Sequence, residues 1–266
     1  MTATATIPFK PNDPEMANRP PHISPEEWAA RVELAACYRI FDHLGWIELI
    51  YNHITLRLAG PDHHFLINPF GLFYKEVTAS NLVKVDIDGN IIGKSDWPIN
   101  PAGFTPHAAI HRAVPDAHCV MHTHTTAGMA VANLKNGLEM TNFYACQFQD
   151  ALAYHDFEGV TTRPDEGARM VQSMGNKRAM ILRSHGLLVA HQTIPAALFT
   201  MFNLQRACEV QIATNSLQRE VLTVPPEIGK WSAEATANFV KKGDAGQDMF
   251  KALKRLCLQK DPSFLT

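Results

Sequence analysis

The segment from Ala117 to Ala132 constrains the fold more than any other part of the chain. Its apolar run at residues 119–121 predicts a buried strand. His122 and His124 stand at the end of this run, and the small residues that follow open a helix. Because residues i and i+2 of a strand share a face, both imidazoles can point at one place. Two neutral nitrogen donors on a stiff backbone provide part of a tetrahedral or octahedral metal shell.

A second apolar strand is interrupted in the same way. The apolar residues 179–182 lead into the pair His185-Gly186, and residues 187–189 are apolar again. Glycine at such a break permits a close approach of the backbone. Taken alone, His122 and His124 are equally well explained as surface histidines at a strand end. The matching position of the third histidine favours a divalent metal held by His122, His124 and His185.

Composition excludes several classes of partner. The chain has 266 residues, which suits one large domain or at most two. Its formal net charge of -2 provides no basic field for nucleic acid and no polybasic patch for a membrane surface. No window approaches the ~20 apolar residues that a membrane span needs. We therefore expect neither nucleic acid nor a membrane as a partner.

The cysteines indicate a reducing compartment. There are five of them, an odd number, and they are widely spaced and mostly lie within apolar runs. No two form a Cys-x-x-Cys pair, so a sulfur-rich zinc site is disfavoured. The first residues lack the charged and apolar regions of a secretion signal. These features predict free thiols in a cytoplasmic protein.

Hydrophobic periodicity predicts a layered α/β fold. A helix begins after Ser24, and alternating apolar residues give two β-hairpins, at 52–71 and 78–93. A long amphipathic helix begins after Thr193. Together with the two histidine-bearing strands, this order predicts a three-layer α/β/α domain around a central, mostly antiparallel sheet.

The chain divides into three parts by composition. Residues 1–23 are rich in proline and predict an extended arm, residues 24–222 form the α/β domain, and residues 223–266 form a helical tail that contacts other subunits. Within the domain, a short helix is expected from Pro106 with Thr105 as its cap. The tail is expected to hold one capped helix near Ser232.

The remaining histidines are interpreted as structural. His107 and His111 lie four residues apart on one helical face, without the glutamate of a His-Glu-x-x-His motif, which favours packing over metal binding. Histidines 53, 63 and 64 lie near the first hairpin and are expected to face solvent.

Several segments together resemble the class II aldolase/adducin family. They are "YNHITLRL", "LINPFGL", "ASNLVKVDIDGNI", "HAAIHRAVPDAHCVMHTHT" and "AMILRSHGLLV", within residues 28–216. The resemblance implies a class II aldolase-like fold and a divalent metal held by His122, His124 and His185. It favours zinc over iron or manganese. It also implies a homotetramer with active sites between subunits.

The chain departs from the aldolases of that family at the phosphate-binding positions. There, two phosphate-binding serines and a catalytic glutamate precede the equivalent of His107, and here Pro-Ala-Gly stands at 101–103. Phe70 replaces a phosphate-binding threonine. Loss of these hydroxyls removes donors for a phosphate dianion, so we expect a non-phosphorylated substrate. The expected substrate contacts are Asn52, Phe70, Gly71, Gly103 and Phe104. Phe70 and Phe104 suit an aromatic acid, with core packing as the equal alternative.

Within the family, these departures resemble the adducin head and a subgroup of metal-dependent decarboxylases and oxygenases. The first interpretation is a lyase, a decarboxylase or retro-aldolase, that acts on a small 2-oxo or aromatic carboxylic acid through a metal-stabilised enolate. Tyr154, His155 and Glu158 are candidates for proton transfer in place of the missing glutamate. One alternative is a non-haem iron oxygenase that uses the same three histidines. The other is an adducin-like binding module without catalysis.

Overall fold

The centre of the molecule is one seven-stranded sheet. The computed structural model describes residues 13–160, 163, 165–243 and 245–266, so the expected N-terminal arm lies outside the described residues as far as residue 12. The strand order is β3-β2-β1-β4-β7-β6-β5. The strands are β1 (His53–Arg57), β2 (Phe65–Ile67), β3 (Val83–Val85), β4 (Cys119–Thr123), β5 (Leu152–His155), β6 (Ala179–Leu182) and β7 (Gly186–His191).

Neighbouring strands are antiparallel along the sheet as far as β6, which pairs with β5 in parallel. The β1–β2 hairpin forms as predicted. The second hairpin is shorter than expected, since β3 returns through a single bridge between Val85 and Ile91. The prediction of an α/β fold around a mostly antiparallel sheet is confirmed.

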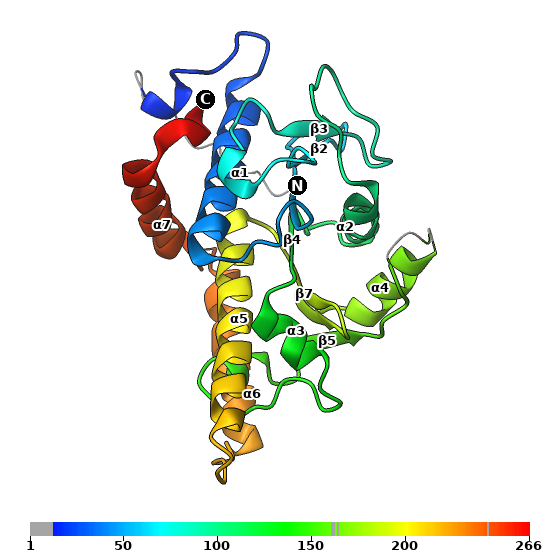
Figure 1. Ribbon diagram of the computed structural model, residues 1–266, viewed down its shortest axis with the longest axis vertical. Coiled ribbons are helices and arrows are strands. Elements are labelled where there is room, and N and C mark those ends of the chain that lie inside the picture. Colours follow the sequence, from blue (N-terminus) through cyan, green and yellow to red (C-terminus); the bar gives the residue numbers. More distant parts are fainter. Residues whose placement is uncertain (1–12, 161–162, 164, 244) are drawn as a thin grey trace.

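Helices cover both faces of the sheet (Figure 1). They are α1 (Pro25–Leu44), α2 (Pro101–Ala113), α3 (Thr126–Ala132), α4 (Glu166–Met174), α5 (Ile194–Ser216), α6 (Pro226–Lys241) and α7 (Gln247–Lys260). Short 3-10 helices lie at Pro14–Met16, Tyr74–Glu76, Ala145–Phe148 and Pro262–Leu265. The largest apolar cluster joins one sheet face to α1 and α5, and two smaller clusters join the other face to α2 and α4.

Local signals fix the ends of the two long helices. Ser24 caps α1, since its hydroxyl accepts a hydrogen bond from the Glu27 amide at 3.1 Å. Gly45 ends α1 in the left-handed region, with φ of 73°. Thr193 caps α5 in the same manner as Ser24, through the Ala196 amide. Both helix starts agree with the sequence prediction.

The start of α2 differs from the prediction. The helix begins at Pro101, with Asn100 as its cap residue, and Pro106 lies inside it. Proline lacks an amide hydrogen, so the helix gives up one backbone hydrogen bond there. The Thr105 hydroxyl does not cap the helix and instead donates to the Pro101 carbonyl at 2.9 Å.

The tail also differs from the prediction, because it forms two helices. Ser232 lies in the middle of α6, where its hydroxyl donates to the Ile228 carbonyl. Helix α7 packs along α1 and buries Phe250 and Cys257.

The five cysteines all lie within the described residues, and each is buried and free, as their spacing predicts. Over the same residues, no helix combines the length and hydropathy required to cross a membrane.

Candidate metal centre

Three histidines meet at the end of the two central strands. His122 is the fourth residue of β4, His124 follows the strand directly, and His185 lies in the turn between β6 and β7. One ring nitrogen from each lies within 4.8 Å of the others. The structure therefore brings together the three side chains that the sequence selected as metal ligands.

The orientation of His122 is fixed by the backbone of the neighbouring strand. Its Nδ1 lies 2.9 Å from the Leu187 carbonyl oxygen, which can only accept a hydrogen bond, so Nδ1 carries the hydrogen. The lone pair of Nε2 is then directed at the cluster, where His124 Nε2 lies 2.7 Å away. A backbone partner of this kind is the usual means of orienting a metal-binding imidazole.

The histidines of the cluster are held in their neutral forms. Burial lowers the pKa of His122 well below its ordinary value, and the neighbouring imidazoles lower it further. Burial also lowers the pKa of His185, to about 4, and that of His124. Metal binding requires neutral imidazole, so the donor set fits a divalent cation near neutral pH.

Gly186 allows the turn that carries His185 to lie against the end of β4, which carries His122 and His124. A Cβ atom at this position would lie 2.2 Å from the Thr123 carbonyl oxygen and 3.3 Å from a His124 ring carbon. Ser184, on the other side of His185, adopts a left-handed backbone with φ of 56°. The turn thus holds His185 against the end of β4 through a contact that only glycine permits.

A row of buried polar side chains continues from the cluster beneath α2. The Thr55 hydroxyl lies 2.8 Å from His107 Nδ1 and 2.7 Å from His111 Nε2. His111 Nδ1 lies 2.7 Å from the Ala117 carbonyl oxygen. Both histidines of α2 are therefore packed within the structure, as their spacing suggested.

His53 differs from the prediction, because it is 5% exposed and not solvent-facing. It pairs with His122 across β1 and β4, and α2 covers its ring. The sequence places His53 next to a turn, but the covering helix comes from residues far along the chain. Burial lowers the pKa of His53 to about 4.

The expected substrate contact Gly103 lies directly against His53. A Cβ atom at Gly103 would lie 2.7 Å from His53 Nδ1. The imidazole thus fills the space that a side chain at position 103 would need. Within the described residues, the buried Nε2 atoms of His53 and His107 have no hydrogen-bond partner.

The other expected substrate contacts lie in different environments. Asn52 is 1% exposed, and neither polar atom of its amide has a partner among the described residues. The rings of Phe70 and Tyr51 lie 6.4 Å apart, and Gly71 has φ of 109°. Phe104 is buried in the small apolar cluster between α2 and the strands β2 and β3, so it is part of the hydrophobic core.

Tyr154 contacts Leu138 and Arg183. Its hydroxyl accepts a hydrogen bond from the Leu138 amide at 3.0 Å, and the Arg183 guanidinium lies 4.6 Å from the ring centroid. Because successive residues of β5 point to opposite faces, His155 lies on the other side of the sheet from Tyr154.

His155 and Glu158 both have partners. His155 Nδ1 lies 2.9 Å from the Ser173 hydroxyl. The Glu158 carboxylate accepts two hydrogen bonds from Arg169, at 2.7 and 2.5 Å, and Arg169 lowers the pKa of this carboxyl group. Such a bidentate pair keeps Glu158 ionised.

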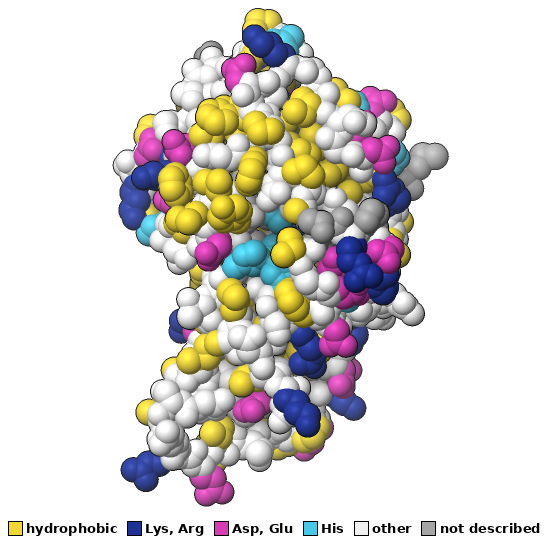
Figure 2. Space-filling view, turned by 45° about the vertical axis from the view of Figure 1, so that its right-hand side comes forward, with side chains coloured by type: hydrophobic (Ala, Val, Ile, Leu, Met, Phe, Trp, Pro, Cys, Tyr) yellow, Lys and Arg dark blue, Asp and Glu magenta, His cyan; other side chains and the backbone are white. Residues whose placement is uncertain are grey.

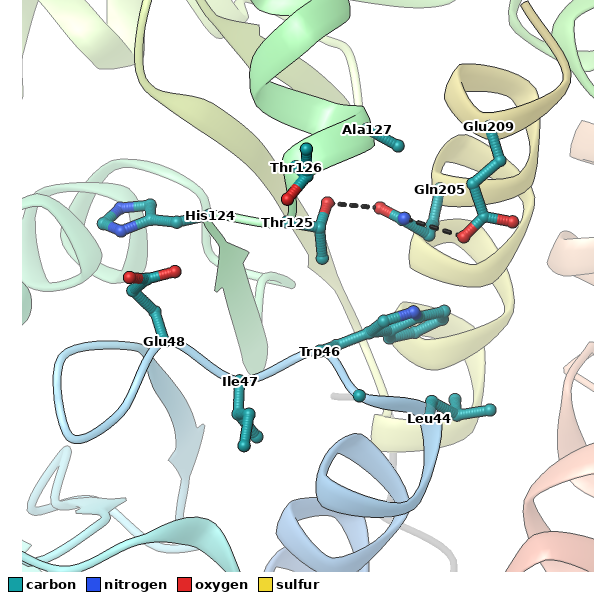
Figure 3. Close-up of a pocket in the computed structure, with 11 residues that line it drawn as sticks. Leu44, Trp46, Ile47, Glu48, His124, Thr125, Thr126, Ala127, Gln205 and Glu209 are labelled. Carbon is teal, nitrogen blue, oxygen red and sulfur yellow. Dashed lines mark hydrogen bonds between the residues drawn. The ribbon is translucent and has the colours of Figure 1, made fainter. Parts of the chain in front are cut away.

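A pocket of about 320 Å³ opens beside His124 (Figure 3). Its lining consists of Leu44, Gly45, Trp46, Ile47, Glu48, His124, Thr125, Thr126, Ala127, Gln205 and Glu209. The Glu48 carboxylate faces the His124 imidazole (Figure 3). No motif in the sequence singles out Glu48, which stands in a turn after α1.

His124 and His185 are partly exposed, whereas His122 is buried. Figure 2 shows histidine side chains at the surface with hydrophobic side chains beside them. Phe157 is 55% exposed, and its ring centroid lies 6.4 Å from that of His185. A site with this border is open to a small molecule from solvent.

Fold and site together define an α/β protein with a histidine cluster at the ends of its central strands. Residues 32–212 match the family model described as "Class II Aldolase and Adducin N-terminal domain". The chain therefore belongs to the class II aldolase/adducin family.

Three similar proteins illustrate the range of this family. A provisionally named aldolase class 2 protein of Caulobacter vibrioides is 46% identical over 77% of this chain and 80% of its own length. The solved structure of an aldolase II superfamily protein from Pseudomonas syringae superposes with a TM-score of 0.86 at 38% identity, covering 92% of this chain and 98% of the other. Alpha-adducin of Mus musculus is 40% identical over 85% of this chain, which spans 32% of adducin.

Proposed function

We propose that this chain is a metal-dependent lyase, a decarboxylase or retro-aldolase, that acts on a small non-phosphorylated 2-oxo or aromatic carboxylic acid. The observation that carries the proposal is the convergence of His122, His124 and His185 with their nitrogen donors within 4.8 Å. Membership of the class II aldolase/adducin family supports it. Zinc is the cation that we propose first, with iron or manganese as alternatives.

The three histidines would hold the cation and leave part of its coordination shell open. A bound divalent cation supplies Lewis-acid stabilisation of developing oxyanion charge. Because all three imidazoles are neutral, the protein adds no negative charge of its own to the shell, and an anionic bidentate substrate is favoured. The Leu187 carbonyl keeps His122 in the required tautomer, and Gly186 keeps His185 in place.

The surroundings of the cluster support a substrate without phosphate. Gly103 offers no side-chain donor, and the space beside it is filled by the His53 ring. Phe70 offers an aromatic ring and no hydroxyl. A phosphate dianion would lose its water without gaining enough donors in return.

Metal analysis and substrate screening together test the proposal. Elemental mass spectrometry should find close to one divalent ion per chain in the purified protein. Exhaustive chelation should abolish the release of CO₂ or aldehyde from 2-oxo and aromatic acids. His122→Ala should lose the ion while staying folded. His22→Ala, which removes an exposed histidine, is the matched control. Full activity after complete metal removal would refute the proposal.

The relation to alpha-adducin supports a second candidate, a binding module without catalysis. This candidate predicts no bound ion and no turnover with any acid of the panel. Oxygen uptake by iron-loaded protein in the same assays would instead assign the histidines to an oxygenase.

We also propose that the protein is cytoplasmic and forms a homotetramer, the assembly that the resemblance to the class II aldolase/adducin family implies. Light scattering of the purified protein would then give four times the mass of the chain, and a monomeric mass would contradict the tetramer.

A further inference from the structure

The pocket beside His124 runs from the candidate metal centre towards α5. The end of α1 with the turn after it (residues 44–48) forms one side, and residues 124–127 at the start of α3 form the other. Helix α5 contributes Gln205 and Glu209 at the far end (Figure 3). Its volume of about 320 Å³ is near the lower limit of the roughly 300–1,000 Å³ typical of small-molecule sites. The pocket therefore has room for a short carbon chain that extends from the metal.

The carboxylate of Glu48 is free to accept hydrogen bonds from a ligand. Within the described residues, its side chain makes no hydrogen bond or ion pair at all. The turn that carries it is fixed, because the Tyr51 amide donates to the Glu48 carbonyl and Leu49 has φ of 50°. The negative charge of Glu48 favours the protonated form of His124, against the larger effect of burial on that pKa.

The far end of the pocket is polar but already balanced in charge. The Thr125 hydroxyl donates to Gln205 Oε1 at 2.6 Å, and Gln205 Nε2 donates to Glu209 at 2.8 Å. Arg206 forms an ion pair with the same Glu209 carboxylate. Carboxylate, amide and hydroxyl oxygens along this wall retain unused lone pairs, so the wall offers many more acceptors than donors.

We propose that this pocket binds the part of the substrate that lies away from the metal, and that this part is a neutral, hydroxyl-bearing carbon chain with Glu48 accepting a hydrogen bond from a hydroxyl group. The proposal rests on the proposed function, because it assumes that the carboxylate end of the substrate lies at the three histidines. It narrows the substrate class from small carboxylic acids in general to hydroxylated ones.

The charges and polarity of the pocket disfavour other chains. A second anionic group would face the unpaired Glu48 carboxylate. An ammonium group would lie close to a divalent cation and be repelled by it. An unsubstituted alkyl or aromatic group would remove water from Glu48, Thr126 and Gln205 without replacing their hydrogen bonds.

Two stable probes test the proposal by calorimetry on the zinc-loaded full chain. Gluconate and 2-hydroxyhexanoate share the carboxylate and the 2-hydroxyl group that would reach the metal, and they differ only in the hydroxyl groups farther along the chain. Wild-type protein should bind gluconate at least about tenfold more tightly, since hydrogen bonds to a charged acceptor are worth about this factor or more. Glu48→Leu should reduce the preference to about twofold or less, and Glu48→Gln should give an intermediate value.

Asp62→Asn is the matched control, because it removes an exposed carboxylate from the hairpin turn far from the pocket, and it should keep the full preference. Thermal unfolding checks that each variant is folded. Equal affinity for the two probes in wild-type protein, or an unchanged preference in Glu48→Leu, would overturn the pocket assignment while leaving the proposed function intact. No binding of either probe would also overturn the pocket assignment alone. Binding that survives unchanged in His122→Ala would overturn both.

Discussion

The imidazole of His53 occupies the space that a side chain at position 103 would need. Nδ1 of His53 lies 2.7 Å from the place of a Cβ atom on Gly103, well inside van der Waals contact. The histidine and the glycine therefore depend on each other. A chain with a larger residue at position 103 would need another position for His53.

A double-mutant cycle can measure this dependence. Gly103→Ala should destabilise the protein by about 1–3 kcal/mol, the usual cost of overpacking a core. In the His53→Ala background, the same change should be neutral or stabilise the protein by up to about 1 kcal/mol, because alanine is the better helix former. Urea unfolding of the four proteins gives the coupling energy. A coupling energy near zero would show that the two residues do not compete for space.

The turn around His185 should respond in opposite directions to changes on its two sides. Gly186→Ala should destabilise the protein and lower its metal content, since its Cβ would lie 2.2 Å from the Thr123 carbonyl oxygen. Ser184→Gly should stabilise the protein by about 1 kcal/mol, because it relieves a left-handed backbone. Denaturant unfolding and metal analysis of both variants test the pair. Full metal content and unchanged stability in Gly186→Ala would contradict the close contact.

Added zinc should raise the midpoint of thermal unfolding. Binding to the folded state alone stabilises it by about 2.7 kcal/mol when the free ion is at 100 times its dissociation constant. His122→Ala and His185→Ala should abolish this shift, whereas the exposed-residue variant His22→Ala should keep it. An equal zinc-dependent shift in the His122 variant would place the ion elsewhere.

His191 should make stability depend on pH. Burial lowers its pKa in the folded state to about 4, with Arg178 acting in the same direction. The unfolded chain, with an ordinary pKa of about 6.5, binds the proton first as the pH falls. The stabilisation is therefore complete above about pH 6.5 and is lost as the pH falls towards 4, by up to about 1.4 kcal/mol per pH unit.

Unfolding of His191→Gln over this pH range isolates that contribution. The variant keeps a partner for the Thr200 hydroxyl, which lies 2.9 Å from His191 Nε2, but it cannot titrate. Its free energy of unfolding should fall less steeply between pH 6.5 and 4. Identical slopes in the two proteins would mean that His191 binds its proton equally in both states.

Local sequence signals predicted the elements that depend on neighbouring residues. Ser24 and Thr193 mark helix starts because their hydroxyl groups accept hydrogen bonds from backbone amides in the first turn, which have no partner within the helix. The apolar runs ahead of His122 and His185 marked strands, and their glycine and small-residue neighbours marked the turns. These signals were sufficient to predict that the three histidines lie close together.

The parts that were not predicted depend on residues far apart in the chain. His53 looks like a surface histidine until α2 covers it. Pro106 looks like the start of a helix, and only the packing of α2 on the sheet shows that the helix continues through it. Glu48 belongs to no motif, and its position becomes informative only beside His124.

The register of the central strands has a consequence for synthesis of the protein. His122 on β4 lies opposite Leu188 on β7. The two strands that carry the candidate centre are therefore synthesised at different times on the ribosome. A nascent chain that ends before His185 carries two donors but cannot close the shell around an ion. If the centre holds a metal as proposed, tight binding would require β4 and the turn before β7 to have docked, and occupancy of the centre would report the pairing of these strands.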